Sequence, residues 1–225
     1  MVSPSLWRPR MRDRAVNSLF GVVIYDGVEP IDIGGTVGVL SMARRVLPRV
    51  ESVTIAERRG SVVLAGGLEV MAQASFADAA TCDRLIVCGG PGWRTQVKTP
   101  AMLDFLRKAP SRHIASVCTG ALILGAAGVL DGHTATTRRM AVGAETIAPL
   151  AALEEMAPKA RGVPAAVVED GPVVTGGGVS LAIDATLYLL GQVYGEDAAA
   201  EVAAVIEYDR AYAANKAALG HFKIG

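Results

Sequence analysis

A stretch near the middle of the chain, HIASVCTGALILGAAGVL at 113–130, constrains the fold most strongly. Residues 114–117 form the kind of short run that makes a buried parallel strand, and the apolar residues from Thr119 onward are typical of a helix covered on nearly all sides. Cys118 lies at the turn between the two. A nucleophile at such a turn stands clear of the backbone, and small residues flank this one. The stretch therefore predicts a nucleophile elbow in a layered α/β fold.

The helix start beside Cys118 favours a negative charge, because its free N–H groups form the positive end of the helix dipole. We therefore expect this turn to lower the pKa of the Cys118 thiol and to leave the N–H of Thr119 facing a developing anion. A structural role is the alternative, since many cysteines behave as small buried hydrophobes. Cys88, which ends an apolar run, fits that alternative, as does Cys82, which has no partner at metal-ligand spacing.

Composition excludes several classes of protein. The 225 residues are 51% hydrophobic and 5% aromatic, which suits one well-filled globular domain. The 22 lysines and arginines balance the 22 acidic residues, so no net charge attracts nucleic acid or an acidic membrane. Three cysteines without metal-ligand spacing suit a reducing cytoplasm and no metal site. No apolar stretch approaches the length of a membrane span.

Three segments are expected along the chain. Residues 1–17 are basic, are broken by proline and lack the apolar centre of a secretory signal, so we expect a flexible arm there. Residues 18–212 are expected to form the single domain. Residues 213–225 are expected to be a C-terminal tail.

Strand and helix signals alternate along the expected domain. Strands are predicted at 18–25, 50–57, 84–88, 114–117 and 133–137, and helices from 30 onward and at 100–108, 119–130, 138–150, 179–194 and 197–212. Glycine turns predict β-hairpins within 61–71 and 163–175. This alternation predicts a mostly parallel sheet covered by helices on both faces.

Polar groups follow several of the predicted strands, at ends that a parallel sheet brings to one edge. Glu29 and Asp32 follow the first strand, a glycine-rich turn at 89–92 follows the third, and Cys118 follows the fourth. Ligands of open α/β sheets bind at this edge, so these groups could meet there. Helix capping is the alternative role for the two carboxylates. The glycine turn matches neither a Walker loop nor a dinucleotide fingerprint, but it could bring N–H groups near a reacting atom.

A nucleophilic cysteine usually has a histidine base within reach. The three histidines lie at the far end of a strand (His113), in a turn (His133) and in the expected tail (His221), so none is an obvious partner. This argues against glutamine amidotransferase and cysteine protease chemistry. A carboxylic acid beside a thiolate, with backbone donors from the glycine turn and the elbow, suits the addition of water to a small electrophile.

Four motifs together resemble the ThiJ/PfpI superfamily, and within it the isonitrile hydratase branch. They are the elbow SVCTGALILGAAGVLDGHTATT, the run TGGGVSLAID at 175–184, the DIGG run after the first strand and the GGPG turn. The resemblance implies a flavodoxin-like three-layer sandwich with a small β-hairpin, a homodimer, and no cofactor or metal.

The resemblance also implies roles for individual residues. By position, Cys118 would be the nucleophile, Asp32 its acid/base partner and Thr119 the residue beside the nucleophile, with Gly89, Gly90 and Gly178 lining the substrate site. In the isonitrile hydratase branch a thiolate attacks the isonitrile carbon, an aspartate handles protons and water, and an N-substituted formamide leaves. The expected partner is therefore a small electrophilic molecule, with neither nucleic acid nor membrane.

The chain departs from the family pattern in two places. Arg138 and Arg139 follow the paired threonines where relatives often have His-Trp, and residues 209–215 replace a proline-rich segment. Arg138 could bind an anionic substrate, whereas a salt bridge or a dimer contact is the alternative. Both departures bear on the substrate rather than on the fold.

Two other functions compete with a hydratase. Relatives with a glutamate at the acid position have glyoxalase or deglycase-like chemistry or protect against thiol stress, and Glu29 keeps that alternative open. Similar domains also occur fused to helix-turn-helix DNA-binding domains. Because we expect no such domain after the last helix, the third alternative is a stand-alone ligand or redox sensor that responds through thiol oxidation.

Overall fold

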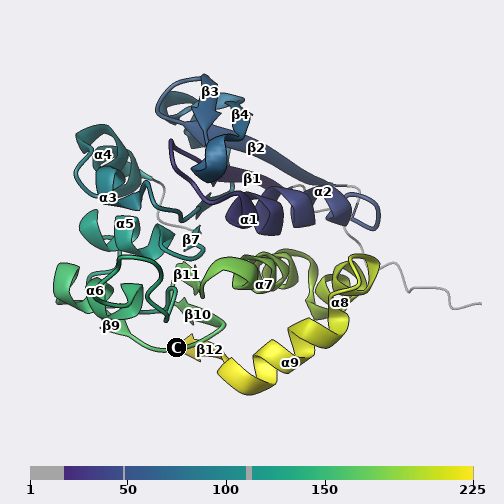
Figure 1. Ribbon diagram of the computed structural model, residues 1–225. Helices are drawn as coiled ribbons and strands as arrows, with labels where there is room; N and C mark the ends of the chain where they lie inside the picture. Colours follow the sequence, from purple (N-terminus) through teal and green to yellow (C-terminus); the bar gives the residue numbers. More distant parts are fainter. Residues whose placement is uncertain (1–17, 48, 110–112, 225) are drawn as a thin grey trace, which may run out of the picture.

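The computed structural model describes residues 18–47, 49–109 and 113–224, so the predicted arm at 1–17 lies outside the described residues. A sheet of eight strands forms its centre (Figure 1). In spatial order the strands are β12 (His221–Ile224), β10 (Val167–Asp170), β11 (Val173–Gly176), β7 (Ile114–Ser116), β6 (Arg84–Val87), β1 (Ser18–Val23), β2 (Val50–Ala56) and β5 (Ala74–Ser75). All neighbouring pairs are parallel except β10 and β11.

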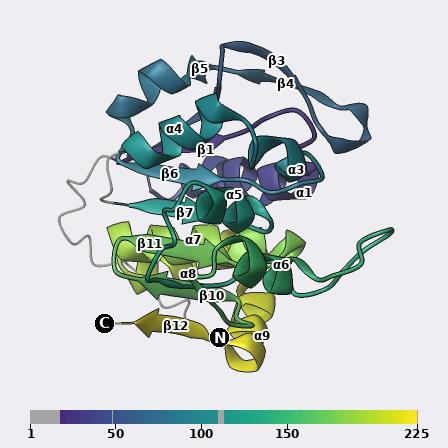
Figure 2. The same cartoon turned by 90° about the vertical axis from the view of Figure 1, so that its left-hand side faces the viewer.

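Helices cover both faces of this sheet (Figure 2). One face carries α1 (Pro30–Ile33), the π-helical segment η1 (Gly34–Gly38), α2 (Val39–Ala43), α7 (Ala182–Tyr194) and α8 (Glu196–Val205), and α9 (Asp209–Leu219) packs beside α8. The opposite face carries α3 (Trp93–Gln96), α4 (Pro100–Lys108), α5 (Gly120–Ala126) and α6 (Pro149–Met156). The predicted flavodoxin-like three-layer sandwich with a mostly parallel sheet is confirmed.

The centre of the core is the strand–turn–helix stretch that the sequence singles out. All residues of β6 and of β7 are buried, as are the residues of α5 up to Gly125. The apolar runs form central strands because both of their faces are covered by helices. The predicted strand and helix within 113–130 are therefore confirmed.

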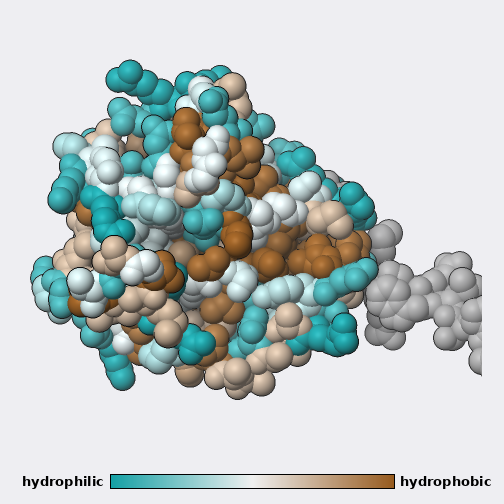
Figure 3. Space-filling model, in the orientation of Figure 1, coloured by the Kyte–Doolittle hydropathy of each residue, from teal (hydrophilic) through white to brown (hydrophobic). Residues whose placement is uncertain are grey.

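Smaller elements lie outside the central sheet. The predicted hairpin is formed by β3 (Gly60–Val63) and β4 (Glu69–Ala72), joined through η2 (Ala65–Gly67). A short parallel pair is formed by β8 (Thr134–Ala135) and β9 (Arg161–Gly162). Figure 3 shows apolar surface over the hairpin and α1, and the large exposed apolar side chains of these elements are Ile31, Val63, Leu68 and Met71. Exposed apolar surface of this kind is typical of protein–protein contacts.

The helix predicted over 138–150 is wrong. This segment is irregular until α6 begins at Pro149, where proline fits the first helical turn. Gly143 has a φ of 58°, which a helix does not allow, and the apolar side chains of Met140 and Val142 are exposed. The apolar side chains of this segment therefore do not pack on the core as one face of a helix would.

The single helix predicted over 197–212 and the tail predicted at 213–225 also need correction. Two helices, α8 and α9, occupy 196–219, and they are separated at Glu207, which has a φ of 54°. Residues 213–219 complete α9, and 221–224 form β12, which pairs with β10 at the edge of the sheet. None of the helices in the described ranges has the length and apolar character that crossing a bilayer requires.

Candidate active site

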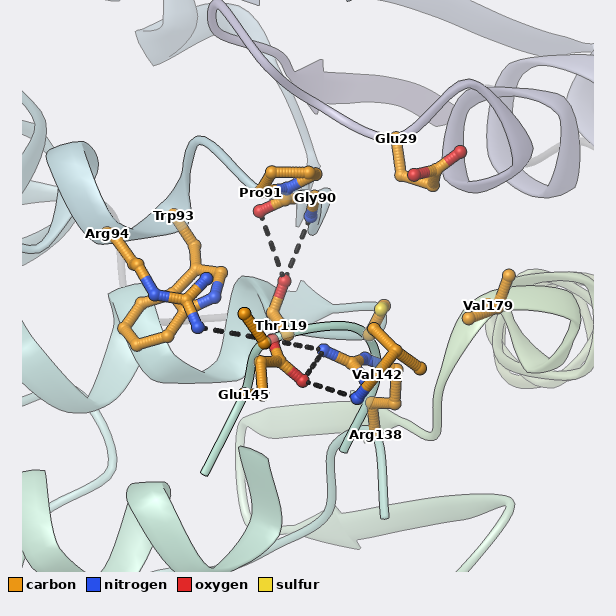
Figure 4. Close-up of a pocket in the computed structure, with 12 residues that line it drawn as sticks. Glu29, Gly90, Pro91, Trp93, Arg94, Thr119, Arg138, Val142, Glu145 and Val179 are labelled. Carbon is orange, nitrogen blue, oxygen red and sulfur yellow. Dashed lines mark hydrogen bonds and ion pairs between the residues drawn. The ribbon is translucent and has the colours of Figure 1, made fainter. Parts of the chain in front are cut away.

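A pocket of about 450 Å³ opens where the parallel strands end (Figure 4). Its lining comes from the segments that follow β1, β6, β7 and β11, together with the irregular segment at 138–148. The lining residues are Glu29, Gly90, Pro91, Trp93, Arg94, Cys118, Thr119, Arg138, Val142, Ala144, Glu145 and Val179. The topology thus brings together groups that lie far apart in the sequence, as the strand order predicts.

Cys118 occupies the sharp turn between β7 and α5 with a strained backbone. Its φ is 51°, a left-handed conformation that is uncommon for residues other than glycine. Its N–H donates to the Gly177 carbonyl at 3.0 Å, and its carbonyl accepts from the Thr137 hydroxyl at 2.6 Å. A Cβ at Gly120 would lie 2.1 Å from the Val87 carbonyl oxygen, so the helix can start this close to β6 only with glycine there. These contacts hold the elbow in place.

The Cys118 thiol does not have the lowered pKa that its place at a helix start predicts. Burial raises the pKa of Cys118 to about 11, and the charge of Asp32 adds to this. The backbone N–H groups of Val179 and Thr119 favour the thiolate, and so does the Arg138 charge. The side chain is only 3% exposed, and the cost of desolvating a thiolate outweighs these groups and the helix dipole.

Asp32 lies in α1, the short helix after β1, and is completely buried, so it is beside Cys118 but not among the residues that line the pocket. Its Oδ2 accepts a hydrogen bond from the Gly89 N–H at 2.7 Å, whereas Oδ1 makes no hydrogen bond to any described residue. Burial raises the pKa of Asp32 to about 7 despite the Gly89 hydrogen bond, and the Cys118 thiol is near enough to lower it slightly. A carboxyl group that titrates near neutral pH can both take up and release a proton.

The π-helical segment η1 fixes the position of Asp32. The Thr36 hydroxyl, which lies in η1, donates to the Asp32 carbonyl at 2.8 Å. A Cβ at Gly35 would lie 2.7 Å from the Cβ of Ala182, so glycine lets η1 pack closely on α7. Single π-helical turns of this kind are frequent at functional sites.

The glycine turn after β6 has a different function from the one that its free N–H groups predict. The Gly89 N–H is bonded to Asp32, and the Gly90 N–H donates to the Thr119 Oγ1 at 2.9 Å. A Cβ at Gly89 would lie 2.4 Å from the Thr119 nitrogen, and a Cβ at Gly90 would lie 2.3 Å from the Glu29 nitrogen. The turn therefore holds the acid and the elbow together and does not present these two N–H groups to a substrate.

The other predicted site residues lie around this centre. Glu29 precedes α1 and lines the pocket (Figure 4). Gly178 lies just outside the lining, where a Cβ would be 2.6 Å from the Cγ of Arg138, and its neighbour Val179 contributes to the pocket instead. Arg138 lines the pocket, but its guanidinium is paired with Glu145, in agreement with the salt-bridge alternative.

Part of the pocket has no clear signal in the sequence. Val142, Ala144 and Glu145 lie in the segment that the periodicity assigns to a helix, and Arg94 lies beyond the glycine turn. The one available hint is Gly143 within the predicted helix, since glycine favours an irregular segment there. No histidine is among the lining residues, and the described ranges contain no cluster of His, Cys, Asp or Glu that could hold a metal ion.

Comparisons with known proteins agree with this geometry. A model described as the DJ-1/PfpI family matches residues 21–192. The isonitrile hydratase of Pseudomonas putida is 32% identical over 192 residues, which cover 84% of this chain and 77% of the hydratase. The HTH-type transcriptional regulator GbdR of Pseudomonas aeruginosa is 28% identical over 196 residues, which cover 84% of this chain and 50% of the regulator. The crystal structure of a ThiJ/PfpI family protein from Pseudomonas syringae has a TM-score of 0.74 at 25% identity and covers 92% of this chain and 84% of its own.

Proposed function

Because this chain belongs to the DJ-1/PfpI family, we propose that it is a cofactor-independent hydratase that adds water to an isonitrile and releases an N-substituted formamide. The observation that carries the proposal is the buried pair of Cys118 and Asp32 beside the pocket, in which the carboxyl has a pKa of about 7. Similarity to the Pseudomonas putida isonitrile hydratase supports the choice of substrate.

In the first step a carbon–sulfur bond forms. With pKa values of about 7 for Asp32 and about 11 for Cys118, the pair holds one proton between these pH values. As Cys118 Sγ attacks the isonitrile carbon, this proton passes through Asp32 to the same carbon. The product is a thioimidate bound to Cys118, and Asp32 is left as a carboxylate. The N–H groups that favour the Cys118 thiolate, those of Val179 and Thr119, stabilise the attacking sulfur.

In the second step water releases the product. The Asp32 carboxylate takes a proton from a water molecule as its oxygen bonds to the thioimidate carbon. The nitrogen gains one proton, the carbon–sulfur bond breaks with its electron pair returning to Cys118, and the formamide leaves. One proton of the water ends on the formamide nitrogen and the other restores the protonated pair.

A ligand-binding module is the second candidate, because the regulator GbdR matches 84% of this chain. The buried thiol favours binding over redox sensing in that case, since a raised pKa leaves little thiolate to oxidise. Glyoxalase or deglycase-like chemistry through Glu29 has less support, because the carboxyl group that interacts with the Cys118 thiol is that of Asp32.

Turnover of cyclohexyl isonitrile to N-cyclohexylformamide tests the proposal. We expect Cys118→Ala to lower the turnover rate by at least about 10³-fold, because no other group forms the covalent intermediate. Cys82→Ala is the matched control and should keep wild-type turnover, since Cys82 does not line the pocket. Turnover that survives Cys118→Ala would contradict the proposal. A folded wild-type protein that forms no product while Cys118 can still be alkylated would favour the binding module.

A further inference from the structure

The pocket wall contributed by the irregular segment at 138–148 is fixed by one carboxylate. Glu145 lines the pocket, and both of its oxygens lie near Arg138 Nη2, at 2.7 and 2.8 Å. Its Oε2 also accepts the Val142 N–H at 2.9 Å, and Arg94 Nη2 lies 3.2 Å from Oε1. The side chains of Arg138 and Glu145 are each only 11% exposed. Figure 4 shows Glu145 between the two arginines.

Two cations that converge on one point beside a pocket are the usual means of recognising an anion. Arg94 is held in its place by the Trp93 ring, whose centroid lies 4.7 Å from the guanidinium carbon. Arg138 is held by the Met140 carbonyl, which accepts from its Nη1. The chain itself supplies a carboxylate between them: Arg138 is paired with Glu145 in a mostly buried position, and the more exposed Arg94 contacts the same carboxylate.

A substrate carboxylate would have to displace Glu145 to reach these arginines. Glu145 is tethered a few residues from Arg138, so its effective concentration exceeds that of a dissolved competitor. Displacement would also leave the Glu145 carboxylate without partners in a mostly buried position. The neighbouring lining from Trp93, Val142 and Ala144 is apolar, and Glu29 adds a second negative charge to the pocket.

We propose that Glu145 is an internal counter-ion that makes this pocket select electrophiles with an uncharged, apolar substituent and reject those that carry a carboxylate. The substituent would contact Trp93 and the 138–148 segment while the electrophilic carbon reaches Cys118. The part of this inference that concerns hydration substrates rests on the proposed function. The selection against a negative charge can be measured whether or not the protein hydrates isonitriles.

The primary test is alkylation of Cys118 by two reagents of nearly equal size, neutral iodoacetamide and anionic iodoacetate. In both reactions the Sγ–carbon bond forms as the carbon–iodine bond breaks and iodide leaves. The readout is the ratio of the two rate constants for the Cys118 peptide, followed by mass spectrometry and divided by the ratio for a free thiol. Any change in the thiol pKa cancels in this ratio, because it affects both reagents equally.

We expect Glu145→Gln to raise the rate with iodoacetate about tenfold relative to iodoacetamide, because two uncompensated arginines then face the reagent. The gain should disappear in the double variant Glu145→Gln with Arg138→Met. Glu145→Asp, which keeps the charge, should keep a ratio near that of the wild type. The matched control is Glu155→Gln, which removes an equal charge from an exposed position on α6 and should leave the ratio unchanged.

An unchanged ratio in Glu145→Gln would overturn the inference, as would a gain that persists without Arg138. Hydration of isocyanoacetate against its methyl ester then extends the test to turnover, with the ester expected to be the better substrate of the wild type and the preference reduced in Glu145→Gln. If the alkylation ratios shift while neither isonitrile is hydrated, the proposed function fails and the charge selection stands. If both are hydrated but neither the ratios nor the ester preference shifts, the inference fails alone.

Discussion

Among the described residues two aspartates are completely buried, and one of the two lies beside the pocket. Asp32 follows β1, and Asp184 lies in the first turn of α7. Each has one carboxylate oxygen, Oδ1, that makes no hydrogen bond within the described ranges. Burial raises the pKa of both, to about 7 for Asp32 and about 6 for Asp184.

The partners of the two carboxylates differ. Asp184 Oδ2 accepts from the Tyr208 hydroxyl at 2.9 Å and from the Asn215 side-chain amide at 3.1 Å, and both partners belong to the start and body of α9. Asp32 Oδ2 accepts the backbone N–H of Gly89, and the Cys118 thiol interacts with the carboxyl. A raised pKa alone therefore does not identify a catalytic acid. A nucleophile and a pocket beside it distinguish Asp32, whereas Asp184 attaches one helix to another.

The largest expected difference is in turnover. Asp32→Asn should lower the rate of formamide production by about 10²–10³-fold, because the amide cannot transfer the proton that both steps need. Asp184→Asn should keep the rate within about twofold of the wild type. Initial rates at saturating isonitrile measure both. An equal loss of rate in Asp32→Asn and Asp184→Asn would contradict the view that only the first of these carboxyl groups takes part in catalysis.

A second expected difference is in stability against pH. Asp32 keeps its proton up to about pH 7 in the folded protein but only to about pH 4 when unfolded, so its contribution to the free energy of unfolding falls as pH rises across this window. An asparagine does not ionise, so Asp32→Asn should not lose stability as pH rises. Its free energy of unfolding should exceed that of the wild type by up to about 4 kcal/mol at pH 8 and differ little at pH 4. Urea unfolding at the two pH values measures this. A variant that is less stable than the wild type at pH 8 would contradict the expectation.

The smallest expected effects are the changes in the free energy of unfolding caused by two tyrosine substitutions. Tyr208→Phe should lower the free energy of unfolding by about 1–2 kcal/mol, and by more at pH 8 than at pH 4, because it removes a hydrogen bond to an ionised Asp184. Tyr25→Phe is the matched change near the pocket, where the hydroxyl donates to the Cys88 carbonyl at 2.9 Å. Its cost, about 1 kcal/mol, should not depend on pH, since a carbonyl does not titrate. Denaturant midpoints at both pH values separate the two, and the same pH dependence in both would contradict the assignment.

Elements with a continuous local signal are predictable from the sequence. The β6 and β7 strands and α5 consist mostly of apolar and small residues, so their type and burial follow largely from the residues alone. The edge strand β12 has no comparable signal, because its HFKI sequence is short and its partner β10 is distant in the chain. The 138–148 segment has helical spacing but no core to cover, and only the tertiary structure shows that.

The candidate site is likewise predictable from the sequence only in part. Cys118 and Asp32 can be placed together because the carboxyl ends of parallel strands share one edge. The direction of the Cys118 pKa shift cannot be predicted, because it depends on how deeply the thiol is buried. Glu145 could not be identified either, since its partner Arg94 is brought to it only by the folded chain.

The position of β12 bears on the order in which the molecule can be completed during synthesis. Because β12 follows every other strand of the central sheet, β10 has one unpaired edge until residues 221–224 have left the ribosome. Asp184 likewise lacks its two hydrogen-bond donors until Tyr208 and Asn215 have been made, which follow α7 and α8 in the chain. The elbow and Asp32 need none of these residues. A growing chain can therefore assemble its reactive centre while one side of its sheet is still open to other strands.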